Sequence, residues 1–577
     1  MLDPYRMIVV NIASSLILIS GLLIYKFIFP KQKINLFFLL ILISILPIIS
    51  IFRNGDYESG DFNIHIYRSM AFYDSLIDRN IMPSWAKDLN ATYGYPLFIF
   101  NYPLPYYLLS FLHFLGLGFI ESMKIFLALN IILSGIFMYI FSQKLLKNSL
   151  AAFTASIFYI FTPYHLIDIH FKIAIGEILA FTILPLIFFF IQKYYEKKDF
   201  TFLLWAGTFL SLLIMSHAII GFFAISIIAP YIFFLNKHRA KNGLMQNIYV
   251  FMITTILSLY IWLAPFIFNS YLYIQKAPVT TVYFPQVFEL FYSPWRAGFL
   301  FQGPIGQISF LIGYTQIFVV IASFILFFLK KTAKKYLNDQ RFWLIISFII
   351  LFLISPYSKF LWENFSFVKA AGSHRLLLLL TFSIAILAGF LSLILVKRNV
   401  LVYVLIVATI GYTILNWGHR RVIPEINDSI LKANLWKSTS EGEGHFYANS
   451  KWIDIKHPWF SKRPKSNIEI IKGEGEIKNL IRASTKHIYS VSAKTPLLLQ
   501  ENTLYFPGWK AFVNEKVIPL KPSDKGIIHL SAPQGLYELK VVYEDIPIYK
   551  LLKFVSLLSL VGVSIFIILK FLYSYRH

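Results

Sequence analysis

Long apolar runs, separated by short polar segments, recur along almost the whole chain. A helix that crosses a bilayer needs about 17–25 mostly apolar residues, and many of the runs approach or reach that length. We therefore predict an α-helical polytopic membrane protein with about thirteen spans. The predicted spans are residues 7–29, 34–52, 120–141, 150–164, 178–190, 202–216, 219–235, 248–268, 307–328, 342–354, 376–396, 400–415 and 551–572.

Charge supports this interpretation and gives the predicted orientation. The chain of 577 residues is 57% hydrophobic and carries a net charge of +24. Its basic residues follow alternate apolar runs and do not gather in one domain, which is typical of cytoplasmic loops and argues against a nucleic-acid partner. We expect an extracytoplasmic N-terminus and a cytoplasmic C-terminus. The abundance of Ile, Lys and Phe indicates an AT-rich prokaryotic genome, so we expect the plasma membrane of a prokaryote.

The pattern changes after residue 416. Charge rises, and stretches such as 497–501, 526–530 and 537–543 have the short alternation of β-strands, punctuated by Pro and Gly. We predict three parts. Residues 1–416 form a multi-spanning domain with an outer loop at 53–103, residues 417–547 form an extracytoplasmic β-sandwich, and residues 548–577 form a last span with a short cytoplasmic tail.

The outer loop at 53–103 concentrates acid beside the apolar runs. It holds six of the 15 acidic residues that precede Gly418, including Asp56, Glu58 and Asp61. One such carboxylate can act as a general base toward an acceptor hydroxyl, and two or three can hold a divalent cation such as Mg²⁺ or Mn²⁺. We predict a catalytic or metal site here. Capping of the next helix is the structural alternative for Asp61.

The residues after Asp61 have helical periodicity. Phe62, Ile66 and Met70 recur on one face, which predicts an amphipathic helix from Asp61 to Arg79 lying on the bilayer. Asp61 and His65 then share a second face at positions i and i+4. We predict that His65 assists the acid site, with a structural or solvated histidine as the alternative.

A second group of ionisable residues joins two predicted spans. Asp168, His170, Lys172 and Glu177 lie within ten positions. Ionisable groups at a membrane boundary usually pair or line a cavity, so we predict either a substrate-binding site or a Lys172–Glu177 ion pair at the headgroups. Arg375 begins another span on the same predicted side, and its planar guanidinium suits a phosphate.

Several of these motifs together resemble one family. They are Gly60-Asp61 with His65, Pro83-Ser84-Trp85, Gly94 to Phe98, Tyr102 to Tyr107, Pro163 to Asp168, Gly176-Glu177, Ser216-His217, Leu361-Trp362 and Arg375. The chain resembles the prokaryotic membrane proteins called 6-pyruvoyl-tetrahydropterin synthase-related, in patches over roughly the first 400 residues. The arrangement is also similar to the GT-C class of membrane glycosyltransferases.

The GT-C resemblance implies a function. It implies a catalytic Asp61 in the first outer loop, Asp168 and Glu177 in a second loop of the site, and Arg375 on the donor phosphate. The partners would be the bilayer, a polyprenyl-phosphate-linked sugar donor and a glycan, lipid or protein acceptor. The sequence fixes no cofactor beyond the divalent cation considered above. Two alternatives stay open, a flippase or transporter for lipid-linked glycans and a non-catalytic scaffold for cell-envelope assembly.

Overall fold

A computed structural model gives the structure of the chain. It describes residues 6–239, 243–272, 284–292, 309–364, 372–418, 421–439, 449–453 and 462–576. The predicted span at 307–328 therefore begins outside the described residues and is seen from residue 309 onward. The predicted domain 417–547 likewise includes segments that are not described.

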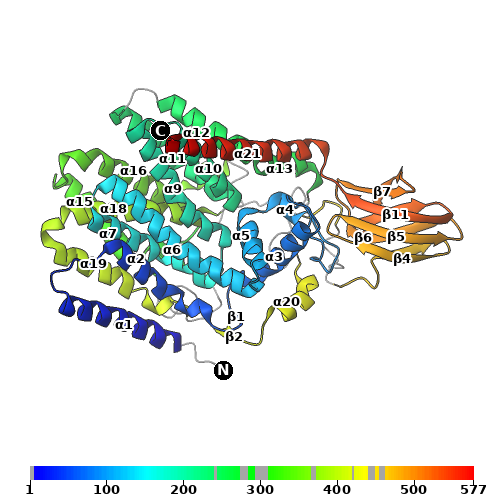
Figure 1. Cartoon of the computed structure of the whole chain (residues 1–577), viewed down its shortest axis with the longest axis horizontal. Coiled ribbons are helices and arrows are strands. Elements are labelled where there is room, and N and C mark those ends of the chain that lie inside the picture. The colour runs from blue at the N-terminus through cyan, green and yellow to red at the C-terminus, as the bar shows by residue number, and fades with distance from the viewer. Residues whose placement is uncertain are drawn as a thin grey trace. The chain divides into compact units, whose positions relative to one another are not determined.

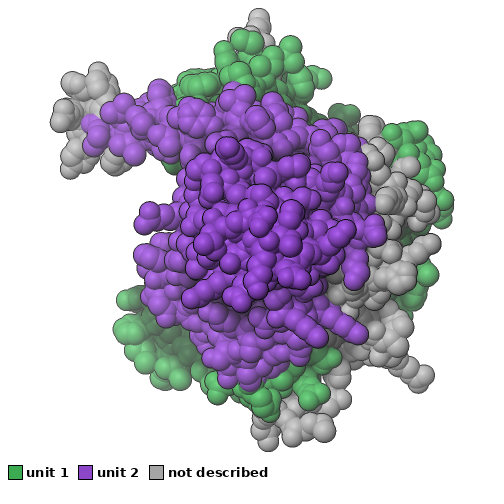
Figure 2. Space-filling view, turned by 90° about the vertical axis from the view of Figure 1, so that its right-hand side faces the viewer, with its two compact units in different colours: residues 1–62, 123–255, 280–425 green, residues 63–122, 256–279, 426–577 purple. Residues whose placement is uncertain are grey.

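The chain divides into two compact units, each built from separate stretches of sequence. The first unit comprises residues 1–62, 123–255 and 280–425, and the second comprises 63–122, 256–279 and 426–577. Figure 2 colours the first unit green and the second purple. Segments that are far apart in the sequence thus fold together in both units.

The first unit is almost entirely helical (Figure 1). One helix, α6 (Phe119–Leu146), starts in the second unit and continues into the first, and α12 (Gly243–Leu257) ends in the second. The other helices are α1 (Arg6–Ile28), α2 (Leu36–Ile45), α7 (Ser149–Ile160), α8 (Pro163–Ile167), α9 (Ile175–Lys197), α10 (Thr201–Ser216), α11 (Ala218–Arg239), α14 (Val287–Phe291), α15 (Tyr314–Phe328), α16 (Leu337–Ile354), α17 (Lys359–Glu363), α18 (Leu376–Ile394) and α19 (Asn399–Gly411). A short strand pair, β1 (Asp56–Tyr57) and β2 (Val422–Ile423), completes the unit.

Helix α18 forms the core of the first unit. Its sequence is apolar on every side, and 89% of its span is buried by neighbouring helices. A helix that is hydrophobic all round is expected to be buried in this way. Helices α7, α15 and α16 pack against it. Arg375 lies at its N-terminal end, so the buried helix fixes the position of the Arg375 backbone.

The helices agree with the predicted spans. Eight helices among the described residues are long and apolar enough to cross a membrane. Two further bent pairs, Ser149–Ile160 with Pro163–Lys172 and Leu244–Leu257 with Leu259–Tyr271, pass the same test when each is taken together. Shorter apolar helices occupy Leu36–Phe52, Thr201–Ser216 and Tyr314–Phe328. The prediction of a helical polytopic membrane protein is confirmed.

The second unit combines helices with a β-sandwich. Its helices are α3 (Phe62–Ile77), α4 (Leu97–Phe100), α5 (Leu104–Phe114), α13 (Leu259–Phe268), α20 (Asp428–Asn434) and α21 (Pro547–Arg576). Its strands are β3 (Ile468–Lys472), β4 (Gly475–Arg482), β5 (Lys486–Ala493), β6 (Leu497–Leu504), β7 (Trp509–Val513), β8 (Lys516–Ile518), β9 (Leu520–Pro522), β10 (Ile527–Ala532) and β11 (Gly535–Tyr543). All their pairings are antiparallel, in the orders β3-β6-β10-β9 and β4-β5-β11-β7-β8.

The two sheets are linked through their buried faces. Strand β11 alternates between buried and more exposed positions, and Leu539 and Val541 are fully buried. Such alternation is typical of a sheet with one face in a core. On β6, the buried Glu501 carboxylate accepts hydrogen bonds from Arg482 and Tyr489 of the other sheet, at 2.7 and 3.0 Å. The predicted C-terminal β-sandwich is confirmed.

Candidate active site

The ionisable cluster lies where two helices of the first unit are joined. Helix α7 ends at Ile160 and the short α8 starts at Pro163. The helix axis bends by 47° between α7 and the segment Pro163–Lys172. Residues Asp168–Lys172 then form a π-helical turn, which ends at Ile173 with a left-handed φ of 56°. Wide turns of this kind are uncommon and often mark functional sites. This break in the helices brings Asp168 and Lys172 close to Glu177 at the start of α9.

Glu177 is the centre of the cluster. Its Oε1 lies 2.7 Å from Lys172 Nζ and 3.4 Å from Arg375 Nε, and its Oε2 accepts a short hydrogen bond from the Tyr164 hydroxyl. Lys172 Nζ also lies 3.2 Å from Asp168 Oδ1. The Lys172–Glu177 ion pair predicted as one alternative is therefore present. It belongs to a larger network of two acids and two cations.

Acids and cations differ in their exposure. The side chains of Asp168 and Glu177 are 0% and 2% exposed, whereas those of Lys172 and Arg375 are 18% and 24% exposed. Buried carboxylates thus hold two cations that keep part of their surface open. The second oxygen of Asp168, Oδ2, has no hydrogen-bond partner among the described residues. A partly open pair of cations with this support can contact a ligand phosphate.

The acidic loop meets the cluster through its backbone. The N–H of Gly60 donates to the carbonyl oxygen of Phe171 at 2.7 Å, and the N–H of Asp61 donates to that of Lys172 at 3.0 Å. The backbone of the half-buried Asp61 therefore lies against the π-helical turn in the first unit. Nearby, Ser59 Oγ accepts the N–H of Phe62, so a hydroxyl contributes to capping at this helix start.

The rest of the loop is also anchored. Strand β1 pairs with β2, and Gly55 precedes it with a φ of 70°. A Cβ at Gly55 would lie 2.3 Å from the carbonyl oxygen of Ile423, so glycine is required there. On the other side, Lys124 Nζ donates to the carbonyl oxygens of Arg53 and Gly55 at 2.5 and 2.6 Å. These contacts restrict where Asp61 can lie.

Tyr57 adds a third contact between the loop and the π-helical turn. Its hydroxyl donates to the carbonyl oxygen of Ile169 at 3.4 Å. Burial, together with the adjacent Asp56 carboxylate, raises the pKa of Tyr57 well above its usual value. The phenol therefore stays protonated at neutral pH and remains a donor.

The other predicted acids lie on the same loop. The Asp56 carboxylate is buried and accepts the N–H of Tyr57 at 2.6 Å, whereas Glu58 is exposed and its own N–H donates to Arg421. Within the described ranges, no group of three or more His, Cys, Asp or Glu side chains is arranged to hold a metal ion. Asp56, Glu58 and Asp61 are therefore not arranged as a set of three metal ligands in this structure. Their assignment as ligands stays a prediction.

Two histidines singled out in the sequence are buried. His170 belongs to the π-helical turn and is 1% exposed. His65 belongs to the second unit, where its Nδ1 lies 3.0 Å from the Tyr106 hydroxyl, which also accepts a hydrogen bond from Asn101. Burial, aided by Arg68, lowers the pKa of His65 well below its usual value, so its ring is neutral at pH 7. This environment fits the structural alternative for His65.

Some neighbours of the cluster were not predicted as site residues. Tyr164 contacts Glu177 directly, and His217 and His374 lie close enough to affect its carboxylate electrostatically. All three occur beside helix ends that the apolar pattern locates, next to His165, Ser216 and Arg375. Their position at a helix end was thus the sequence feature that could have pointed to these three residues. It could not show which of the side chains at helix ends face Glu177.

The fold defines a polytopic membrane protein with a polar cluster where its helices end. Residues 99–419 match the family described as the 6-pyruvoyl-tetrahydropterin synthase related domain, a membrane protein. The match covers more than half of the chain, so the chain belongs to this family, as its motifs predicted. The matched residues include Asp168, Lys172, Glu177 and Arg375, whereas Asp61 precedes them.

Other similarities are partial. An uncharacterized protein from Lactococcus lactis subsp. cremoris is 25% identical over 224 residues, which are 38% of this chain and 36% of that protein. The oligosaccharyltransferase of Archaeoglobus fulgidus gives a TM-score of 0.43 at 12% identity, over 69% of this chain and 55% of that one. The arabinofuranosyltransferase AftD from Mycobacteria gives 0.45 at 13% identity, over 68% and 27%. TM-scores below 0.5 do not establish a common fold.

Proposed function

We propose that the protein is a membrane glycosyltransferase that uses a polyprenyl-phosphate-linked sugar. The acceptor would be an extracytoplasmic glycan, lipid or protein, and the site would face outward, as the charge pattern predicts. The backbone connection of Asp61 to Lys172 is the observation that carries this proposal. It holds the Asp61 backbone against the turn that carries Lys172, which supports a common site for the carboxylate and the two cations.

Asp61 and the two cations would have separate roles in the reaction. The acceptor hydroxyl attacks the anomeric carbon of the donor sugar and gives its proton to the Asp61 carboxylate. The bond between that carbon and the phosphate oxygen breaks, and polyprenyl phosphate leaves with the bonding electrons. Lys172 and Arg375 would stabilise the negative charge that develops on the phosphate.

The acids of the cluster contact its two cations and would hold them in position. Glu177 contacts both Lys172 and Arg375, and Asp168 contacts Lys172. Holding the two cations in place before the phosphate arrives reduces the ordering that binding would otherwise require. Glu177 and Asp168 are therefore positioning residues in this proposal, and Tyr164 supports Glu177 through its hydroxyl.

The test is transfer of a labelled sugar by the purified full chain from a panel of polyprenyl-phosphate sugars. Asp61→Asn should remove turnover while leaving the backbone hydrogen bond to Lys172 in place. Asp524→Asn, in the exposed turn between β9 and β10, is the matched control and should keep wild-type turnover. An Asp61→Asn variant with full activity would show that another group is the base. Addition of EDTA tests the metal prediction separately.

One observation favours the transport alternative. The bent α7–α8 pair and the buried Asp168 are features that transporters use at substrate and ion sites. A flippase would move a fluorescent lipid-linked glycan across a vesicle membrane without breaking its sugar–phosphate bond. Intact lipid on the far leaflet, with no sugar transferred, would favour this alternative.

A further inference from the structure

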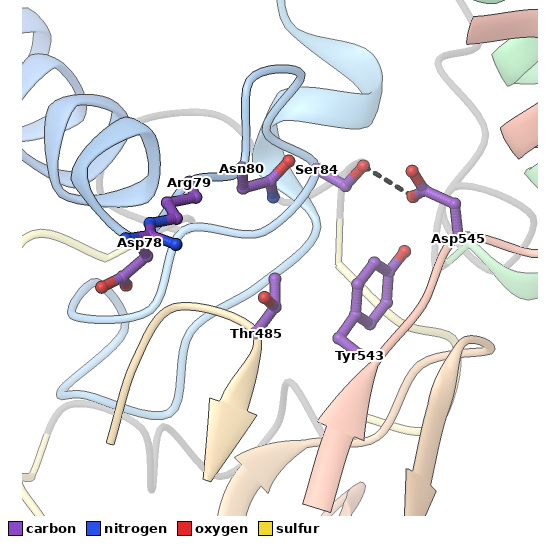
Figure 3. Close-up of a pocket in the computed structure, with 7 residues that line it drawn as sticks. All are labelled: Asp78, Arg79, Asn80, Ser84, Thr485, Tyr543 and Asp545. Carbon is purple, nitrogen blue, oxygen red and sulfur yellow. Dashed lines mark hydrogen bonds between the residues drawn. The ribbon is translucent and has the colours of Figure 1, made fainter. Parts of the chain in front are cut away.

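The second unit contains a polar cavity of about 280 Å³ that has no part in the proposed transfer reaction. It lies between the loop that follows α3 and one end of the β-sandwich (Figure 3). Figure 3 shows Asp78 and Arg79 at one end and Tyr543 and Asp545 at the other. Its lining residues are Asp78, Arg79, Asn80, Ser84, Thr485, Tyr543 and Asp545.

The two carboxylates of the cavity are held in fixed positions. Asp78 Oδ2 accepts both the N–H and the hydroxyl of Ser484 at 2.6 Å. Asp545 accepts the Ser84 hydroxyl and the Lys553 ammonium, each at 2.7 Å. These bonds fix both carboxylates, which lowers the ordering entropy that ligand binding must offset.

One donor of the cavity, the Tyr543 hydroxyl, is buried and has no partner in the described part of the chain. The Tyr543 residue as a whole is 7% exposed. Burial, together with the Asp545 carboxylate, raises its pKa well above the usual value, so the hydroxyl stays protonated. A buried polar group without a partner is costly, and a ligand oxygen would satisfy it.

Arg79 has a left-handed backbone conformation just after α3. Its φ is 64°, and its N–H and that of Asn80 donate back to Leu76 and Ser75. This is the hydrogen-bond pattern of a Schellman motif, in which glycine is the usual residue at the left-handed position. Lys147, Lys198 and Lys330 adopt the same left-handed φ just after other helices, so the conformation of Arg79 does not by itself indicate a role for its side chain.

The charges indicate the class of ligand. Lys553 balances Asp545, and Lys87 lies 3.9 Å from Asp78. A metal ion would compete with these lysines, and a phosphate would face two carboxylates. The lining instead contains both donors and acceptors, which suits hydroxyl groups that both donate and accept. The volume is just below the range of about 300–1,000 Å³ usual for ligand pockets, so the ligand must be small.

We propose that this cavity binds one neutral sugar unit of a glycan. Tyr543 and Arg79 would donate to sugar hydroxyls, and Asp78 and Asp545 would accept from them. The Tyr543 ring contacts Trp85 and Trp509 at centroid distances of 5.6 and 5.5 Å, and these contacts hold the ring that carries the unpartnered hydroxyl in place. The inference does not depend on the transfer reaction, because binding alone tests it.

The experiment is titration of the purified full chain with methyl glycosides of glucose, galactose, mannose and N-acetylglucosamine. Binding is followed by saturation-transfer difference NMR and by calorimetry. At least one glycoside should bind saturably, and neither CaCl₂ nor sodium phosphate should compete. Absence of binding by every glycoside, or preferential binding of Ca²⁺ or phosphate, would overturn the proposal.

Three variants connect the binding to this cavity. Tyr543→Phe should weaken it about 3- to 10-fold, because one hydrogen bond is lost, while the melting temperature stays unchanged or rises. Arg79→Gly should weaken it about tenfold or more and also leave the melting temperature unchanged or higher, since glycine relieves the strained φ. Tyr537→Phe, on the same strand, removes a hydroxyl bonded to Pro533 and should bind as wild type. Unchanged affinity in both cavity variants would place the sugar elsewhere.

Discussion

The N–H of Asp61 donates to the carbonyl oxygen of Lys172 at 3.0 Å, and this bond is one of the contacts that join the two ionisable segments of the chain. It is a main-chain contact, so it does not depend on the Asp61 side chain. Substituting the carboxylate therefore leaves this main-chain bond in place. Substituting the loop's glycines changes geometry without touching the carboxylate.

Gly60→Ala tests the geometry alone. A Cβ at Gly60 would lie 3.1 Å from the carbonyl oxygen of Lys172, so the loop must shift by a few tenths of an ångström. Since small misplacements of a catalytic group are costly, we expect sugar transfer to fall about tenfold. The control is Gly21→Ala in α1, where the added Cβ meets nothing within 4 Å. Equal turnover in the two variants would contradict the predicted role of the loop.

Lys124→Met should loosen the same loop from its other side. The ammonium bonds two loop carbonyls, and methionine keeps the stem but removes both bonds. We expect a lower kcat for sugar transfer, with Lys124→Arg retaining part of it. Lys26 is the matched control, because its ammonium also bonds two carbonyls, those of Pro30 and Gln32, at the end of α1. If Lys26→Met lowers kcat as much as Lys124→Met does, the loss of activity comes from general destabilisation of the protein and not from release of the loop.

Glu177→Gln should destabilise the protein more than Tyr164→Phe. The glutamine leaves Lys172 and Arg375 without their shared carboxylate, and breaking a buried ion pair from one side costs about 3–5 kcal/mol. Tyr164→Phe removes one hydrogen bond to a charged group, which is worth about 1.5–3 kcal/mol. Thermal unfolding in detergent should rank wild type first and Glu177→Gln last. The reverse order would show that Glu177 is not the centre of the cluster.

Glu501 should make the β-sandwich sensitive to acid. Burial works to raise its pKa, but His487, Arg482 and Thr503 outweigh it and hold the pKa at about 2, below the usual 4.5. A carboxyl with a depressed folded-state pKa stabilises fully above its unfolded value, and this stability is lost as the pH falls through the folded value. The loss amounts to about 3 kcal/mol between pH 5 and pH 2.

The measurement compares wild type with Glu501→Gln by chemical unfolding at a series of pH values. Other carboxyl groups titrate in both proteins, so only the difference between them reports on Glu501. That difference should shrink by about 3 kcal/mol between pH 5 and pH 2. A difference that stays constant with pH would mean that Glu501 titrates normally.

The sequence predicted the individual helices and strands better than the contacts between them. Apolar runs predicted the helices, because a run long enough to span a bilayer admits few other structures. Alternation at 537–543 predicted β11 (Gly535–Tyr543) for a similar reason. The Lys172–Glu177 pair could be foreseen because the two residues are five positions apart at a helix junction.

The remaining contacts of the site could not be foreseen in the same way. Arg375 reaches Glu177 only because α18 packs in the core, and the backbone bond of Asp61 depends on the π-helical turn. The cavity near Arg79 was missed entirely. Its residues come from segments more than 400 positions apart, and single polar residues in loops carry no periodic signal.

That separation in sequence has a consequence for how the chain is made. Asp78 bonds to Ser484, which is synthesised 406 residues later. At translation rates of about 5–20 residues per second, the segment after α3 waits about 20–80 s for its partner. Until then Trp85, which packs on Trp509, lacks that neighbour and is open to chaperones and proteases. A chain that stopped before the β-strands would lack these contacts, so the folding of the segment after α3 depends on strands made much later.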